Sequence, residues 1–143
     1  MHRIERSVLV PFGAERMFRL VEDVAEYPKF LPGCPAASMR PLPDGSTEAT
    51  IEIAYRGVRS SFTTHNHSRC PESIELELVR GPFKRLSGQW TFHALTPEAC
   101  KVSLSLHYQF AAGLLGKMVA PVFESVAGSM VDAFARRAET LYG

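Results

Sequence analysis

The stretch LSGQWTFHALTPEACKVSLSLHYQF, residues 86–110, decides the fold. Apolar or small side chains alternate with polar ones from Leu86 to Ala94, and again from Val102 to Phe110. Pro97 lies in the short segment between the two halves. An alternation with a period of two predicts a β-hairpin that has one apolar, aromatic face and one polar face. The apolar face needs a cover from elsewhere in the chain.

The segment 114–142 is expected to provide that cover. Its large apolar side chains recur at spacings of 4, 3, 4, 4 and 7 residues, at Val119, Phe123, Val126, Met130, Phe134 and Leu141. This spacing places them on one face of an α-helix. Pro121 is expected to kink or restart the helix. A curved sheet wrapped around such a helix can enclose an apolar cavity.

The rest of the chain reads as one strand and one helix followed by short strands. Residues 4–10 alternate as a strand does, and residues 14–23 have the period of a helix. Residues 24–35 contain three prolines and a glycine, which predict a short helical turn and a loop. Further strands are expected at 34–42, 49–55, 58–67 and 74–78.

This order predicts an α+β fold, with residues 1–143 forming one domain. The expected architecture is a curved antiparallel sheet of about seven strands wrapped around a long C-terminal helix. Short helices follow the first strand.

Composition and charge exclude several classes of protein. Hydrophobic residues make up 45% of the chain and charged residues 22%, with a net charge of +1. So small a net charge gives no overall field that would attract nucleic acid, and no DNA partner is expected. Three cysteines without metal-ligand spacing are typical of reduced thiols in a cytoplasmic protein. No uncharged run approaches the roughly 20 residues that span a bilayer.

Three local motifs together resemble a known family. They are YPKFLPGC at residues 27–34, GPFKRLSGQWTF at 81–92 and FARRAETLYG at 134–143. With the order of the elements, they resemble the START-like (helix-grip, polyketide cyclase) superfamily. More narrowly, the chain resembles the coenzyme Q-binding START-domain family, whose bacterial members include proteins named RatA. The resemblance covers essentially the whole chain.

The resemblance implies two functions. The first is non-enzymatic binding of ubiquinone, or a similar isoprenoid lipid, by a carrier or chaperone that supports respiration. The second, attached to the name RatA, is a toxin that binds the large ribosomal subunit and blocks subunit association. Under the first, the partner is ubiquinone bound as a ligand, with no other cofactor. The expected location is the cytoplasm, with transient contact at the inner membrane surface.

The predicted ligand site lies between the sheet and the long helix. A ligand pocket is typically apolar, with a few polar anchors. Trp90 is the strongest candidate, because a buried indole N–H needs a partner. The alternative is that the same side chains are close-packed core. The predicted lining is Phe30, Leu31, Tyr55, Phe62, Phe83, Leu86, Trp90, Tyr108, Phe110, Leu115, Met118, Val119, Phe123 and Val126.

Two segments are candidate gates of this site. The loop 27–34 reads either as a lid or as a hydrophobic plug. Residues 113–123 read either as the buried start of the helix or as a mobile flap that touches a membrane surface.

Basic residues on predicted turns form a second candidate site, which would bind phosphates. The ionisable residues give no indication of catalysis. Arg56, Arg59, Lys84 and Arg85 would meet phosphates if the fold brings them together, and are otherwise solvated. The histidines lie on predicted outer faces, so no metal site is expected. The inward strand faces hold no carboxylate, histidine or lysine, so no catalytic residue is expected. A cyclase-like or hydrolase-like enzyme remains the third alternative.

Overall fold

The computed structural model describes residues 2–143 and has the expected α+β architecture. Within those residues, seven antiparallel strands form one sheet in the order β1-β7-β6-β5-β4-β3-β2. The elements are β1 (His2–Val10), α1 (Ala14–Glu22), the 3-10 helix η1 (Val24–Lys29), β2 (Ala36–Pro41), β3 (Thr47–Tyr55), β4 (Val58–Arg69), β5 (Ser73–Arg80), β6 (Phe83–Thr96), β7 (Ala99–Phe110) and α2 (Leu114–Tyr142).

The β6–β7 hairpin is built as its alternation predicts. Leu86 pairs with Tyr108, and Trp90 pairs with Leu104. All four side chains are buried, whereas Ser87 and Gln89 between them are exposed. Gly88 pairs with Leu106, and a Cβ atom at Gly88 would collide with that residue and with the Ser105 carbonyl. Only glycine therefore fits at this point of the hairpin.

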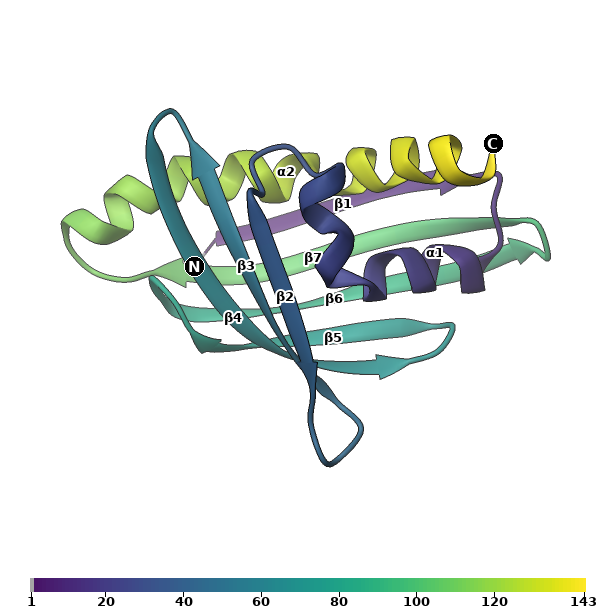
Figure 1. The fold of residues 1–143 in the computed structure, drawn as a ribbon, viewed down its shortest axis with the longest axis horizontal. Coiled ribbons are helices and arrows are strands. Elements are labelled where there is room, and N and C mark those ends of the chain that lie inside the picture. The colour runs from purple at the N-terminus through teal and green to yellow at the C-terminus, as the bar shows by residue number, and fades with distance from the viewer. Residues whose placement is uncertain (1) are drawn as a thin grey trace.

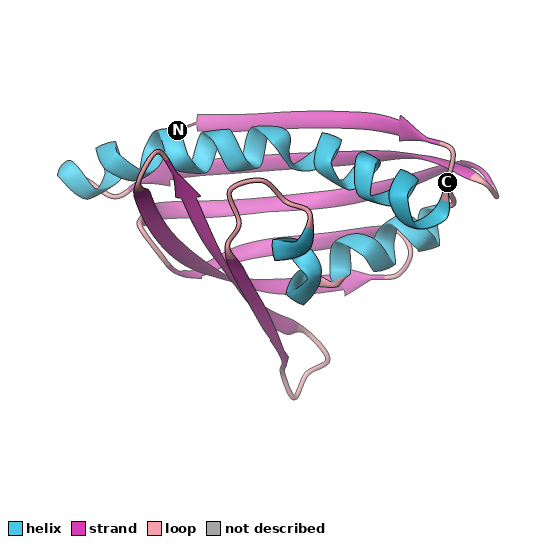
Figure 2. Cartoon of the chain, turned by 45° about the horizontal axis from the view of Figure 1, so that its top comes forward, coloured by secondary structure: helices cyan, strands magenta, loops and turns pink. Residues whose placement is uncertain are grey.

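The sheet curves around α2, which lies along its concave face (Figures 1 and 2). The strands β2, β3 and β4 cross steeply over the others, and the pairing of β4 with β5 shifts register between Thr63 and Thr64. Such a bulge increases the local twist of the strands. The helix continues through Pro121 without interruption, contrary to the expected restart. It is a single helix of 29 residues.

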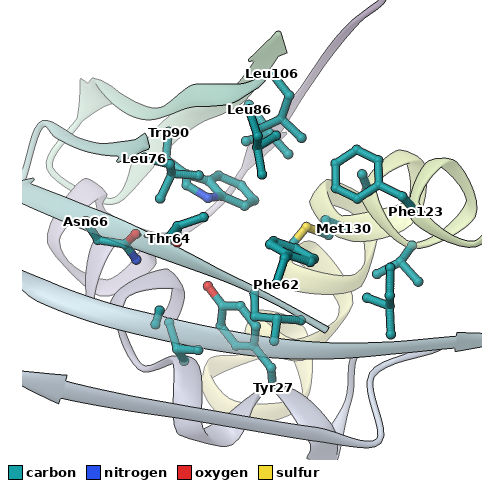
Figure 3. Close-up of a pocket in the computed structure, with 17 residues that line it drawn as sticks. Tyr27, Phe62, Thr64, Asn66, Leu76, Leu86, Trp90, Leu106, Phe123 and Met130 are labelled. Carbon is teal, nitrogen blue, oxygen red and sulfur yellow. Dashed lines mark hydrogen bonds between the residues drawn. The ribbon is translucent and has the colours of Figure 1, made fainter. Parts of the chain in front are cut away.

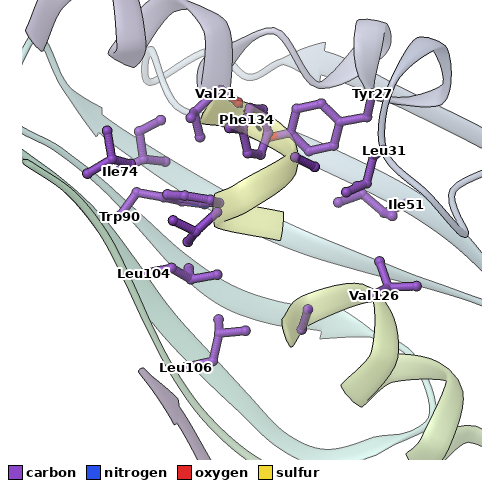
Figure 4. Packing of buried hydrophobic residues seen from close by; sticks show 14 of the residues in the cluster. Val21, Tyr27, Leu31, Ile51, Ile74, Trp90, Leu104, Leu106, Val126 and Phe134 are labelled. Carbon is purple, nitrogen blue, oxygen red and sulfur yellow. Dashed lines mark hydrogen bonds between the residues drawn. The ribbon is translucent and has the colours of Figure 1, made fainter. Parts of the chain in front are cut away.

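The end of the sheet near the C-terminus of α2 is closed by α1 and η1. Phe18 of α1 is fully buried and meets Phe92 at 5.6 Å between ring centroids. The Tyr27 hydroxyl donates to the Val21 carbonyl at 2.5 Å, which fixes η1 against α1. Figure 4 shows Tyr27 and Leu31 facing Phe134 of α2. Leu31 is 3% exposed, so its side chain closes this end of the core in the structure.

Candidate functional site

A small cavity lies between the concave face of the sheet and the middle of α2. Its volume is about 50 Å³. Strands β3 to β7, η1 and α2 contribute its walls (Figure 3). The lining is Val24, Tyr27, Ala49, Ile51, Ile53, Phe62, Thr64, Asn66, Leu76, Leu86, Trp90, Leu104, Leu106, Phe123, Val126, Ala127 and Met130.

The volume of this cavity decides what it can hold as it stands. A ligand pocket usually measures about 300–1,000 Å³, whereas a single water needs roughly 10–15 Å³. The cavity, at about 50 Å³, therefore has room for a few waters. A ring-sized ligand would enter only if α2 or the loop 27–34 moved away from the sheet.

One side of the cavity is polar. The Thr64 hydroxyl donates to Asn66 Oδ1 at 2.7 Å. Neither the Asn66 amide nor the Trp90 indole donates a hydrogen bond to any other described residue, although their side chains are 7% and 2% exposed. Both residues also line a second hollow of about 20 Å³ beside Glu22 and Thr47. Figure 3 shows Asn66, Thr64 and Trp90 together, opposite Phe123.

Two aromatic clusters flank the cavity. The first cluster comprises Phe62, Phe83, Phe110 and Phe123, whose rings meet at 4.8 to 5.9 Å between centroids. The second cluster comprises Tyr27, Phe30, Trp90 and Phe134, with the Phe134 ring 5.1 to 5.3 Å from each of the other three. Edge-to-face contacts at these distances are favourable beyond the area that they bury.

The structure brings together part of the predicted lining. Phe62, Leu86, Trp90, Phe123 and Val126 do line the cavity. The remaining predicted residues do not border it; they are Phe30, Leu31, Tyr55, Phe83, Tyr108, Phe110, Leu115, Met118 and Val119.

The prediction that Tyr55 points inward is wrong. Its side chain is 36% exposed, because it is the last residue of β3 and lies beyond the cavity. The guanidinium of Arg56 stacks on its ring at 5.1 Å. Leu115 and Met118 are also outside, at 57% and 46% exposed, because the first turns of α2 project past the sheet.

Sequence reasoning missed Asn66 and Tyr27 as lining residues. Asn66 follows the same alternation as Phe62 and Thr64, so extending that pattern by two residues would have found it. Tyr27 lies in an irregular turn, where no periodicity indicates direction. Burial raises the pKa of the Tyr27 hydroxyl, with smaller contributions from the nearby charges of Cys34 and Asp23.

The hydroxyl of Tyr108 bonds to a side chain of α2. Its side chain is 1% exposed, yet its hydroxyl donates to Glu124 Oε2 of α2 at 3.0 Å. Desolvation and this hydrogen bond raise the pKa of Tyr108 to about 12, although Arg6 acts in the opposite direction. The contact joins β7 to the first half of α2.

The predicted basic residues share one end of the molecule. Figures 1 and 2 place the β3–β4 turn, the β5–β6 turn and the start of α2 there together. Within residues 2–143, Arg56, Lys84, Arg85 and Lys117 are exposed and form no ion pair. We call these four residues the basic end. Arg59 differs from them, because it pairs with Glu52 on the neighbouring strand.

Polar residues near the β2–β3 turn form a network of their own. Ser46 Oγ lies 2.6 Å from His65 Nε2 and also bonds to Asp44. The hydrogen bonds from Ser46 lower the pKa of the Asp44 carboxyl, helped by His65 and His67. Across residues 2–143, no group of three His, Cys, Asp or Glu side chains is arranged to hold a metal ion. The network stabilises the turn.

Known proteins agree with this architecture. Residues 10–135 match the model of the polyketide cyclase/dehydrase and lipid transport family. The ribosome association toxin RatA of Vibrio cholerae is 41% identical over 143 residues, which cover 100% of this chain and 99% of that protein. The mitochondrial coenzyme Q-binding protein COQ10 homolog B of Xenopus laevis is 25% identical; the match covers 99% of this chain and 60% of that protein.

Solved structures show the same fold. The Zhui aromatase/cyclase from Streptomyces sp. R1128 superposes with a TM-score of 0.83 at 17% identity. The match covers 96% of this chain and 93% of that one. The chain therefore belongs to the polyketide cyclase/dehydrase and lipid transport family, of START-like fold, and within it to the bacterial RatA-like proteins.

Proposed function

We propose that this chain associates with the large ribosomal subunit and thereby blocks subunit association. The observation that carries the proposal is the 41% identity, over essentially the whole of both chains, with a protein named for ribosome association. The small cavity is consistent with it, since a surface interaction needs no interior space. On this proposal the protein acts in the cytoplasm by binding alone, without catalysis.

The basic end supplies the surface for this interaction. Arg56, Lys84 and Arg85 have no carboxylate partner among residues 2–143, so their charges are available to the phosphates of ribosomal RNA. Arg59 is already neutralised by Glu52 and is expected to contribute less. Binding through phosphate contacts releases counterions and therefore weakens steeply as salt concentration rises.

Sedimentation with purified large subunits tests the proposal. The wild-type chain should co-sediment at low salt and dissociate as salt rises. The variant K84E/R85E should bind at least tenfold more weakly. A matched control is K101E/R136E, which makes the same change in net charge with exposed residues at the other end of the molecule. Equal binding by K84E/R85E and wild type would contradict the assignment to the basic end, and absence of wild-type binding would contradict the function.

A second function is favoured by the polar side of the cavity. We propose that an expanded form of the cavity binds a quinone-like ligand, with the amide of Asn66 and the indole N–H of Trp90 donating to its carbonyl oxygens. The support is that both residues are largely buried, line the cavity and donate no side-chain hydrogen bond to another described residue. The energy would come from burying the apolar ligand, less the cost of opening the fold.

Fluorescence provides the test, because Trp90 is the single tryptophan of the chain. Titration with a short-tailed ubiquinone should quench its emission saturably. The variant N66L should weaken this binding at least tenfold and leave ribosome association unchanged. Quenching that rises linearly without saturation, or equal affinity in N66L, would contradict a ligand site at this position.

A further inference from the structure

The start of α2 leaves three large apolar side chains in solvent. Leu114, Leu115 and Met118 are 71%, 57% and 46% exposed. They occupy adjacent positions in the first two turns of the helix, where residues three and four apart are neighbours. We call them the apolar tip. Figures 1 and 2 show this part of α2 projecting beyond the end of the sheet.

The other exposed leucines of the described chain come from three separate elements. Leu9, Leu95 and Leu141 lie on β1, β6 and α2 respectively, at the opposite end of the molecule from the apolar tip. Single exposed apolar residues are common on protein surfaces and need no explanation. The apolar tip differs because its three members lie within five residues of one helix, at neighbouring positions, and no other described element covers them.

Positive charge surrounds the apolar tip. Lys117 lies within it, and the amide of Ala111 donates to the Pro82 carbonyl at 2.9 Å, which ties the approach to α2 to the start of β6. Lys84 and Arg85 follow directly after that point. The first turn of α2 contains no acidic residue, and its N-cap, Gly113, supplies no side-chain hydrogen bond. The first carboxylate along the helix is Glu124, which is bonded to Tyr108.

We infer that this end of the molecule docks on the surface of an anionic phospholipid bilayer. The apolar tip inserts among the acyl chains, and the basic end contacts the lipid phosphates. Apolar side chains ringed by cations are the pattern of interfacial membrane contacts. The phosphates of ribosomal RNA would bind the cations, but they offer no apolar environment for the exposed leucines. The inference is thus independent of ribosome association, although it shares the basic end.

The contact is shallow and does not span the bilayer. By length and composition α2 is apolar enough to cross a membrane. However, Phe123, Val126 and Phe134 of the same helix are buried against the sheet. Moving them into lipid would unfold the core, so only the projecting turns are free to insert. Tyr55, which is partly exposed at the β3–β4 turn, lies at the same end of the molecule.

Flotation with vesicles tests the inference. The wild-type chain should bind vesicles of phosphatidylcholine and phosphatidylglycerol, and bind vesicles of phosphatidylcholine alone at least tenfold more weakly. The variant L114Q/L115Q/M118Q should lose at least tenfold in affinity for the anionic vesicles. The matched control L9Q/L95Q/L141Q replaces three leucines of comparable exposure and should bind as wild type does.

Ribosome sedimentation separates this inference from the proposed function. The variant L114Q/L115Q/M118Q should still bind large subunits, whereas K84E/R85E should lose both partners. Wild-type affinity of the L114Q/L115Q/M118Q variant for anionic vesicles would overturn the inference. So would a failure of the wild-type chain to bind them, which would leave the apolar tip as a contact for another protein.

Discussion

The two ends of α2 differ in how far the rest of the chain buries their side chains. The C-terminal half lies under α1 and η1, and Phe134 there is 0% exposed and touched by Tyr27, Phe30 and Trp90. The N-terminal half begins beyond the sheet, where Leu114 is 71% exposed. One sequence element thus serves as core at one end and as surface at the other.

This difference indicates where stability and function lie. Burial of large side chains supplies most of the free energy of folding, so the buried positions of α2, such as Phe134, should matter far more for stability than its projecting first turns. The first turns of α2, from Leu114 to Met118, project beyond the sheet and contribute little to the core. They lie beside the basic end and include its Lys117, so they are the part of the helix suited to partners. The cavity of about 50 Å³ lies between the two halves.

The largest expected effect is on the buried half. Phe134→Ala should lower the free energy of unfolding by about 3–5 kcal/mol, because it removes a fully buried ring and leaves a cavity. Leu115→Ala, on the same helix, should change it by less than about 0.5 kcal/mol. Urea denaturation of both variants measures the difference. A similar loss of unfolding free energy in the two variants would contradict the difference between the buried and projecting parts of α2.

The contact between β7 and the first half of α2 should have a smaller effect on stability. Tyr108→Phe removes the hydrogen bond to Glu124 and should cost about 1 kcal/mol. Because folding raises the pKa of Tyr108 to about 12, its contribution is complete below pH 10 and is lost as pH rises towards 12. Wild type should therefore lose stability over this range, and the variant should lose less. Parallel pH curves would contradict the role of Tyr108.

A larger side chain in the cavity tests whether the space beside the middle of α2 is empty. Ala49 lines it and is 1% exposed, so Ala49→Val places two more carbon atoms in the space. The expected gain in unfolding free energy is at most about 1 kcal/mol, with saturable quinone quenching abolished. The control is Ala135→Val, a partly buried position outside the cavity lining. A loss above about 1 kcal/mol at Ala49 would show that the space is already filled.

The reactivity of the three cysteines compares core and surface in the wild-type protein, without any substitution. Cys70 is exposed, whereas Cys34 and Cys100 are buried. Burial raises the pKa of the Cys34 thiol to about 11 and also raises that of Cys100. In the native protein, a thiol reagent should modify one cysteine rapidly and the other two only on unfolding. Rapid modification of all three would indicate that the core opens readily.

Strand periodicity predicted the fold and the centre of the site, because the alternation around Trp90 is enforced by burial on one face. The alternation was wrong for Tyr55. There β3 extends beyond the core, so a position on the inward face is no longer covered. The alternation gave no information on whether the basic residues cluster, since the β3–β4 and β5–β6 turns that carry Arg56 and Lys84 come to one end of the molecule only through the fold of the sheet. The size of the cavity depends on packing, which no pattern of residue types determines.

Hydrogen–deuterium exchange in the presence of purified large ribosomal subunits would locate the surface that binds them. The first turns of α2 and the β3–β4 and β5–β6 turns beside them should form that surface. We expect the ribosome to slow exchange at residues 55–59, 81–85 and 111–118 and to leave residues 14–34 unchanged. Protection over α1 and η1, with no change at those three segments, would contradict the account.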